Sequence, residues 1–140
     1  MGKINWGRVF LGGLLWAVVY NALGAASWYL FLKTEWTAAM EALGRPFHET
    51  AGFIAVFLLL TLVAGIFALW LYAAIRPRYG AGPKTAVCAG LALWLIGSLL
   101  PTIAWFRLLL LPVGLLIADL AAALVSIVVA TVVGAWLYQE

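Results

Sequence analysis

Charged side chains are scarce in this sequence: Asp, Glu, Lys and Arg make up 9% of the 140 residues, and 67% are hydrophobic. Soluble domains carry roughly 25% charged residues, so this chain cannot cover a water-facing surface of ordinary size. The composition therefore predicts an integral membrane protein with the lipid bilayer as a partner. The net charge of +3 is small, and the basic residues flank apolar segments, which argues against nucleic-acid binding.

Cysteine and histidine are nearly absent, with one of each. A single cysteine, Cys88, excludes an internal disulfide, and no His, Cys and carboxylate cluster has metal-site spacing. A Gly-rich phosphate loop and a Ser-His-Asp set are also missing. We therefore expect no catalytic residues and no metal, and we predict that the protein is not an enzyme. The weak cofactor candidate is His48, as an axial ligand of haem or chlorophyll; the alternative is an ordinary interfacial histidine.

Four long apolar segments occupy most of the chain, and each exceeds the roughly 18 residues that a membrane-spanning helix needs. They cover residues 4–32, 51–75, 84–106 and 108–138. Between the first two, Trp36, Met40 and Leu43 recur at helical intervals, which is typical of an amphipathic helix in the membrane interface. The predicted fold is all-α: a single transmembrane domain, a four-helix bundle, with a short interfacial amphipathic helix between its first two helices.

The basic residues predict how the chain is oriented. With four spans, both termini and the second link share one side of the membrane. That side carries Lys3, Arg8, Arg76, Arg78 and Lys84, and the other side carries Lys33, Arg45 and Arg107 together with three glutamates. The positive-inside rule then places both termini in the cytoplasm. Arg76, Arg78 and Lys84 either bind anionic lipid headgroups or serve only to orient the chain.

Asp119 is an acidic residue inside a predicted span, where a charge costs about 2.5–3.5 kcal/mol and needs a partner. Counting along the other spans places Asn21, Thr61 and Ser98 at a similar depth. Together these side chains could form a polar layer that carries protons or small solutes. Alternatively, Thr61 and Ser98 bond their own helices while Asn21 alone satisfies Asp119, or Arg107 reaches inward from the outer surface.

Small residues repeat every four positions along the last span. This ladder consists of Ala118, Ala122, Ser126, Ala130 and Gly134. In lipid, small side chains mark places where helices approach closely, so the ladder predicts packing, either within the bundle or against a partner. The tripeptide Trp-Leu-Tyr also closes both the second span, at residues 70–72, and the fourth, at 136–138, either through duplication or by chance.

Three stretches carry a family resemblance: residues 4–8 with the glycines at 12 and 13, residues 70–86 with the turn Arg-Pro-Arg-Tyr-Gly-Ala-Gly-Pro-Lys, and residues 134–138. Together they resemble a family of uncharacterised small bacterial integral membrane proteins. The resemblance implies a four-helix protein of the bacterial inner membrane, and it implies no assigned activity or functional residues.

We expect a non-catalytic function, as an accessory or structural subunit or a scaffold of a bacterial membrane assembly, with protein partners or as a homo-oligomer. Two alternatives stay open. One is an oligomeric proton or small-solute transporter or channel built on the polar layer around Asp119. The other is a binder of lipid, quinone or pigment.

Overall fold

The computed structural model describes residues 3–138. All the regular secondary structure in this region is helical, and turns and loops join the helices. Four helical rods are long and apolar enough to cross a membrane. The first joins α1 (Trp6–Ser27), the π-helical turn η1 (Trp28–Leu32) and α2 (Lys33–Ala42); the second is α3 (Ala51–Tyr79); the third joins α4 (Pro83–Trp94), the π-helical turn η2 (Leu95–Leu99) and α5 (Leu100–Phe106); the fourth is α6 (Val113–Trp136).

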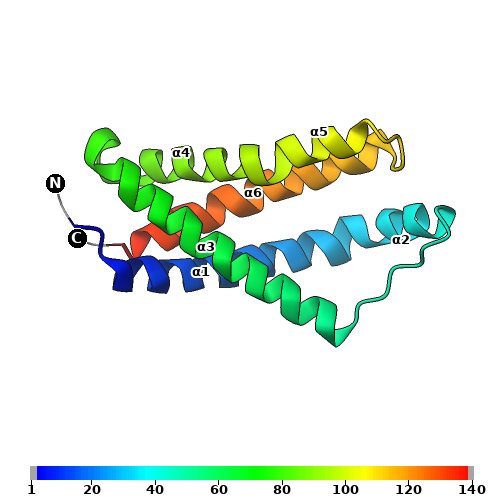
Figure 1. Cartoon of the computed structure of the whole chain (residues 1–140), viewed down its shortest axis with the longest axis horizontal. Helices are drawn as coiled ribbons and strands as arrows, with labels where there is room; N and C mark the ends of the chain where they lie inside the picture. Colours follow the sequence, from blue (N-terminus) through cyan, green and yellow to red (C-terminus); the bar gives the residue numbers. More distant parts are fainter. Residues whose placement is uncertain (1–2, 139–140) are drawn as a thin grey trace.

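The four rods form an elongated bundle in which α6 is central (Figure 1). It contacts α1 on one side and α4 on the other, while α3 crosses obliquely and contacts α1 and α4. Both ends of the described chain and the turn between α3 and α4 lie at the same end of the bundle. Towards the opposite end, α3 separates from the other helices.

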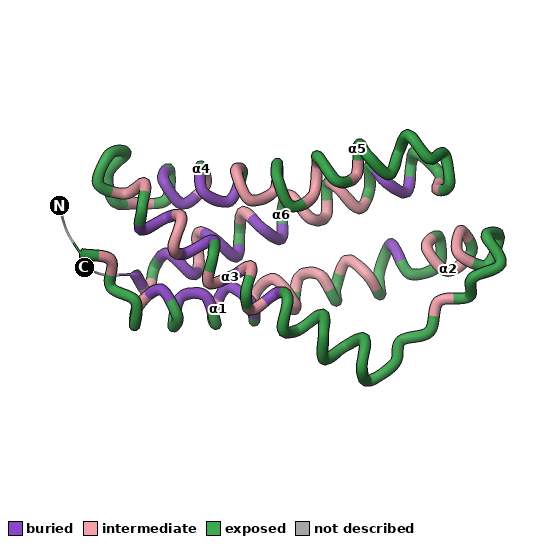
Figure 2. The backbone as a smooth tube through the Cα atoms, in the orientation of Figure 1, coloured by how far each residue is buried: buried purple, intermediate pink, exposed green. Residues whose placement is uncertain are grey.

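The buried residues concentrate in the half of the bundle that holds the termini (Figure 2). This closed half contains residues 9–17 of α1, 61–73 of α3, 85–90 of α4 and 126–135 of α6. In the other half, which we call the open half, the first ten residues of α3 are all exposed. A smaller contact in the open half buries Leu32, Leu115 and Leu116 where η1 meets α6.

Glycine permits the closest helix crossings of the closed half. A Cβ atom added at Gly12 would lie 2.8 Å from the carbonyl oxygen of Gly134, and one added at Gly134 would lie 2.8 Å from that of Gly12. A Cβ at Gly13 would lie 2.8 Å from the Cα of Ile66, and one at Gly65 would collide with the Gly13 carbonyl. Side chains at these positions would therefore force α1 away from α6 and from α3.

A helix covers the residues predicted to form the interfacial helix, but it continues from the first span without a break. Residues 33–42 continue the first span through η1, giving one helix from Trp6 to Ala42. Figure 1 shows α2 running on in roughly the direction of α1. At 1.5 Å per residue, 37 residues measure about 55 Å, well beyond the roughly 30 Å of a hydrocarbon core. The prediction was wrong on this point because the composition changes at residue 33 while the helical backbone does not break.

The second and fourth helices also differ from their predicted limits. The predicted turn at residues 76–84 shrinks to residues 80–82, because α3 continues through Pro77 to Tyr79. Gly80 ends it with a φ of 87° and donates its N–H to the Arg76 carbonyl over 2.8 Å. The fourth helix begins at Val113, not at residue 108, because the loop before it includes Leu109 with a φ of 51° and ends at Pro112.

Candidate functional site

Two residues of the predicted polar layer meet where α1 crosses α3. The Asn21 amide donates to the Thr61 hydroxyl over 2.8 Å and to the Ala17 carbonyl over 2.8 Å. Thr61 in turn donates to the Leu58 carbonyl of its own helix over 2.9 Å. The Asn21 side chain thus links the two helices at the boundary between the closed and open halves. Thr61 therefore makes both kinds of hydrogen bond considered from the sequence, one with a side chain of another helix and one with a carbonyl of its own helix.

The other two members of the layer lie apart from this hydrogen bond. Within residues 3–138, neither the Ser98 hydroxyl nor the Asp119 carboxyl forms a hydrogen bond, and no ion pair joins Asp119 to Arg107. Asp119 is half-buried and lies within electrostatic range of the Tyr20 hydroxyl. The structure therefore brings together Asn21 and Thr61, but it does not join Asp119 to them.

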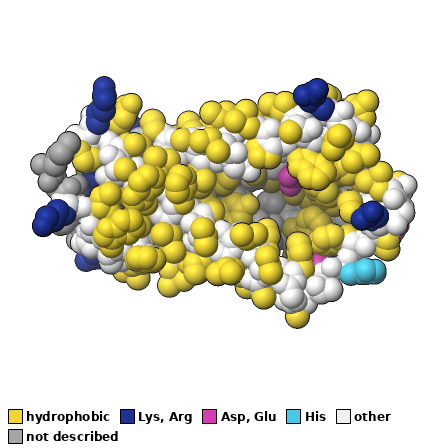
Figure 3. Space-filling view, viewed as in Figure 1, with side chains coloured by type: hydrophobic (Ala, Val, Ile, Leu, Met, Phe, Trp, Pro, Cys, Tyr) yellow, Lys and Arg dark blue, Asp and Glu magenta, His cyan; other side chains and the backbone are white. Residues whose placement is uncertain are grey.

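A cavity of about 220 Å³ opens where α3 leaves the bundle. Its walls include three aromatic residues, Trp16, Tyr20 and Phe57, and the hydroxyls of Thr61 and Ser98. The rings of Trp16 and Tyr20 are stacked, with centroids 4.8 Å apart. In the space-filling view, the surface is hollowed in the open half of the molecule (Figure 3). Ser98 thus faces the same space as Thr61 without bonding to it.

Two tryptophans make interhelical hydrogen bonds that the sequence analysis missed. The Trp16 indole donates to the Thr131 hydroxyl over 2.9 Å, and both residues are buried. The Trp94 indole donates to the Leu120 carbonyl over 3.1 Å. Tryptophan is not a short polar side chain, so depth along the spans does not single out either residue. The available signal was the indole N–H itself, which normally needs an acceptor when it is buried.

The small-residue ladder of α6 turns from the surface into the core. Ala118 is exposed, Ala122 is half-buried, and Ser126, Ala130 and Gly134 are buried. At about 100° per residue, each four-residue step advances about 40° around the helix, so the ladder cannot stay on one face. Its last three members pack inside the bundle and are unavailable to an outside partner, while its first two remain accessible.

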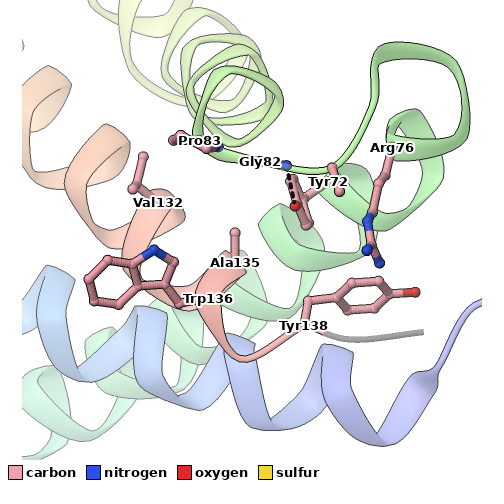
Figure 4. Close-up of a pocket in the computed structure, with 9 residues that line it drawn as sticks. Tyr72, Arg76, Gly82, Pro83, Val132, Ala135, Trp136 and Tyr138 are labelled. Atoms are coloured by element: carbon pink, nitrogen blue, oxygen red, sulfur yellow. Dashed lines mark hydrogen bonds between the residues drawn. The ribbon is translucent and has the colours of Figure 1, made fainter.

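The end of the bundle that holds the termini is basic, as the dark blue side chains at the left of Figure 3 show. Here Arg76 packs over the Tyr138 ring, with its Cζ 5.4 Å from the centroid. The rings of Tyr72 and Tyr138, which close the two Trp-Leu-Tyr segments, meet edge to face at 5.9 Å. Tyr72 accepts the Gly82 N–H over 3.2 Å, and Figure 4 shows this bond beside a cavity. Arg78 and Lys84 are exposed nearby in the chain.

His48 lies in the loop between α2 and α3, at the opposite end, and is exposed. Its neighbour Glu49 accepts hydrogen bonds from the Trp28 indole over 2.9 Å and from the Tyr29 hydroxyl over 3.3 Å. These bonds fasten the loop to η1. Among the described residues, no group of three or more His, Cys, Asp or Glu side chains could hold a metal ion.

Comparisons with protein-family models, with curated proteins and with solved structures found no match to this chain. The family resemblance of the three stretches that carry it is therefore supported by their own residues alone.

Proposed function

We propose that the chain is a multi-pass membrane protein with both termini in the cytoplasm of a bacterial cell. Four apolar rods of at least 24 residues support insertion, as does the apolar outer surface, whose exposed residues include Leu30, Phe31 and Leu60. The basic end supports the orientation, because cytoplasmic segments carry an excess of Lys and Arg. In this arrangement α2 extends beyond the outer membrane surface.

We further propose that the protein is a non-catalytic accessory or scaffold subunit whose open half binds helices of a partner protein. The distribution of helical glycines carries this proposal. Apart from Gly7 in the first turn of α1, the helical glycines described in the closed half all lie at helix crossings, where a Cβ would meet another helix within 3.2 Å: Gly12, Gly13, Gly65, Gly90 and Gly134. Those of the open half would meet nothing within 4 Å: Gly24, Gly52, Gly97 and Gly114.

This contrast matters because glycine weakens a helix by about 1 kcal/mol relative to alanine, and in the closed half this cost is offset by a close crossing at each of the five glycines named above. The open half also has glycines inside its helices, but no other helix of the chain crosses closely at them. On α6, exposed Ala118 lies one four-residue step after Gly114, which is the small-xxx-small spacing that membrane helices use to pack. Helices of a partner would supply the missing contacts.

The first test is the native mass of the protein after gentle extraction from its own membrane. We expect a stoichiometric set of other chains to purify with it. A homo-oligomer without other chains would contradict the accessory role and would favour transport, for which the Asp119→Asn variant in proteoliposomes is the test. A monomer without partners would contradict both proposals.

The second test asks whether the open half makes the contact. Ala118→Leu adds bulk to an exposed site in the open half, whereas Ala74→Leu makes the same change at an exposed site in the closed half. We expect Ala118→Leu to lose the partner and Ala74→Leu to keep it, with both variants folding normally. Equal retention of the partner by both variants would show that the contact lies elsewhere.

The cavity of about 220 Å³ favours a second candidate function, the binding of part of an apolar ligand, such as the ring of a quinone or a segment of a lipid chain. Its walls combine aromatic rings with the hydroxyls of Thr61 and Ser98, a common composition for ligand sites. Organic extraction of the purified protein, followed by mass spectrometry, tests this function. Filling the cavity with Gly97→Phe should remove any ligand found, whereas Gly52→Phe, outside the cavity, should not.

A further inference from the structure

The basic end of the bundle contains a second cavity, of about 240 Å³, between the last turns of α3, the turn into α4 and the end of α6. Arg76 and Tyr72 line it from α3, and Trp136 from α6. Figure 4 shows the Arg76 side chain extending towards the Tyr138 ring, with the Trp136 indole on the far side of the group. The cation–π contact with Tyr138 holds the guanidinium at this wall.

The charges around this cavity favour an anion. Lys3, Arg8, Arg78 and Lys84 belong to the same end of the bundle, whereas the acids in the described chain belong to the open half: Glu35, Glu41, Glu49 and Asp119. One wall, at Gly82 and Pro83, is also the amino end of α4, whose partial positive charge adds to that of Arg76.

We infer that this cavity binds the phosphate group of an anionic phospholipid in the cytoplasmic leaflet. A planar guanidinium with five N–H donors matches the paired oxygens of a phosphate better than an ammonium does. The volume lies below the roughly 300–1,000 Å³ of sites that enclose whole ligands, so a headgroup enters and the chains stay outside. Trp136, which is 78% exposed, and Val132 provide an apolar wall for the first carbons of those chains.

The test compares Arg76→Gln with Arg78→Gln. Each variant removes one positive charge from the same helix end, but Arg78 does not line the cavity and is exposed. Native mass spectrometry of the purified chain, titrated with phosphatidylglycerol against phosphatidylcholine, measures the preference for the anionic lipid. We expect the preference to fall about tenfold in Arg76→Gln, as the loss of a charge-assisted hydrogen bond predicts, and less than about twofold in Arg78→Gln.

Two controls and one contrary outcome make the test decisive. Val132→Phe fills the cavity from the opposite wall and leaves Arg76 in place, so it should also lose the preference while melting as the wild type does. Excess inorganic phosphate should not displace the lipid; displacement would identify a soluble phosphate ester as the ligand and overturn the lipid assignment. Equal losses in both arginine variants would show a diffuse charge effect and would also overturn it.

This inference rests on the proposed membrane insertion but not on the accessory role. A wild-type protein that holds zwitterionic lipid without preference for the anionic one would overturn the site and leave insertion intact. A protein that partitions into the aqueous phase on membrane extraction would refute insertion itself. The two failures are therefore distinguishable.

Discussion

The hydrogen bond between Trp16 and Thr131 joins two buried side chains in the closed half of the bundle. The indole donates to the Thr131 hydroxyl over 2.9 Å, and that hydroxyl donates a hydrogen bond to the Ile127 carbonyl over 2.7 Å. Thr131 is fully buried and Trp16 almost so. Because both groups are sealed from water and lipid, loss of the acceptor would leave an indole N–H without a partner.

We predict that Thr131→Val destabilises the folded chain by about 1 kcal/mol. This lies between the roughly 0.6 kcal/mol average for interhelical hydrogen bonds in membranes and the roughly 1–3 kcal/mol for an unsatisfied buried donor. Unfolding in mixed micelles measures the change. Thr37→Val is the matched control, because the Thr37 hydroxyl donates only to the Lys33 carbonyl of its own helix. A double-mutant cycle with Trp16→Phe should give a coupling energy of similar size; zero coupling would refute the assignment.

At the scale of elements, the crossing of α1 and α3 depends on a pair of glycines. We predict that Gly65→Ala destabilises the chain by about 1–3 kcal/mol, the usual cost of overpacking, because its Cβ would meet the Gly13 carbonyl and the Trp16 ring. Gly24→Ala is the matched change in the open half, where the new methyl meets nothing within 4 Å. It should be neutral or stabilising by up to about 1 kcal/mol through helix propensity. The same micelle assay measures both, and equal destabilisation would contradict the proposed division of the bundle.

The elements were predictable from apolar length, but their ends and their continuity were not. Each of the four apolar segments overlaps one of the observed rods, since the length of an apolar run reports directly on a helix that can span a membrane. A Pro or Gly in the sequence is a weaker signal, as Pro77 shows by lying inside α3. Near Pro101 the chain adapts differently: the helix widens into η2 just before it, where the ring would otherwise crowd the Gly97 carbonyl.

Of the candidate site, the pairing of Asn21 with Thr61 was within reach of a depth count, because polar groups in apolar surroundings at one level seek each other. The separation of Asp119 from this pair could not be predicted, because the depth of a residue in the membrane does not give the rotation of its helix about its own axis. That rotation decides which neighbour a side chain faces, and it is set by how the helices cross in the assembled bundle. The separation of α3 from the bundle also left no pattern in the sequence, since its first ten residues are as apolar as any buried helix.

The whole molecule is asymmetric in charge along its length, and this gives the last prediction. The termini and the α3–α4 turn lie at the basic end, and the loop with His48 lies at the other (Figures 1 and 3). In a Cys88→Ser background, which removes the native thiol, we predict that a membrane-impermeant maleimide labels Gly44→Cys in intact cells but labels Ala81→Cys only after lysis. The positive-inside preference for the basic turn is the reason.

Permeabilised cells control for reactivity, because both exposed positions should then react equally. The reverse pattern would mean that the basic end faces outward, and it would remove the anionic leaflet from beside Arg76. Labelling of both sites in intact cells would mean that the rods do not span the membrane in one fixed orientation.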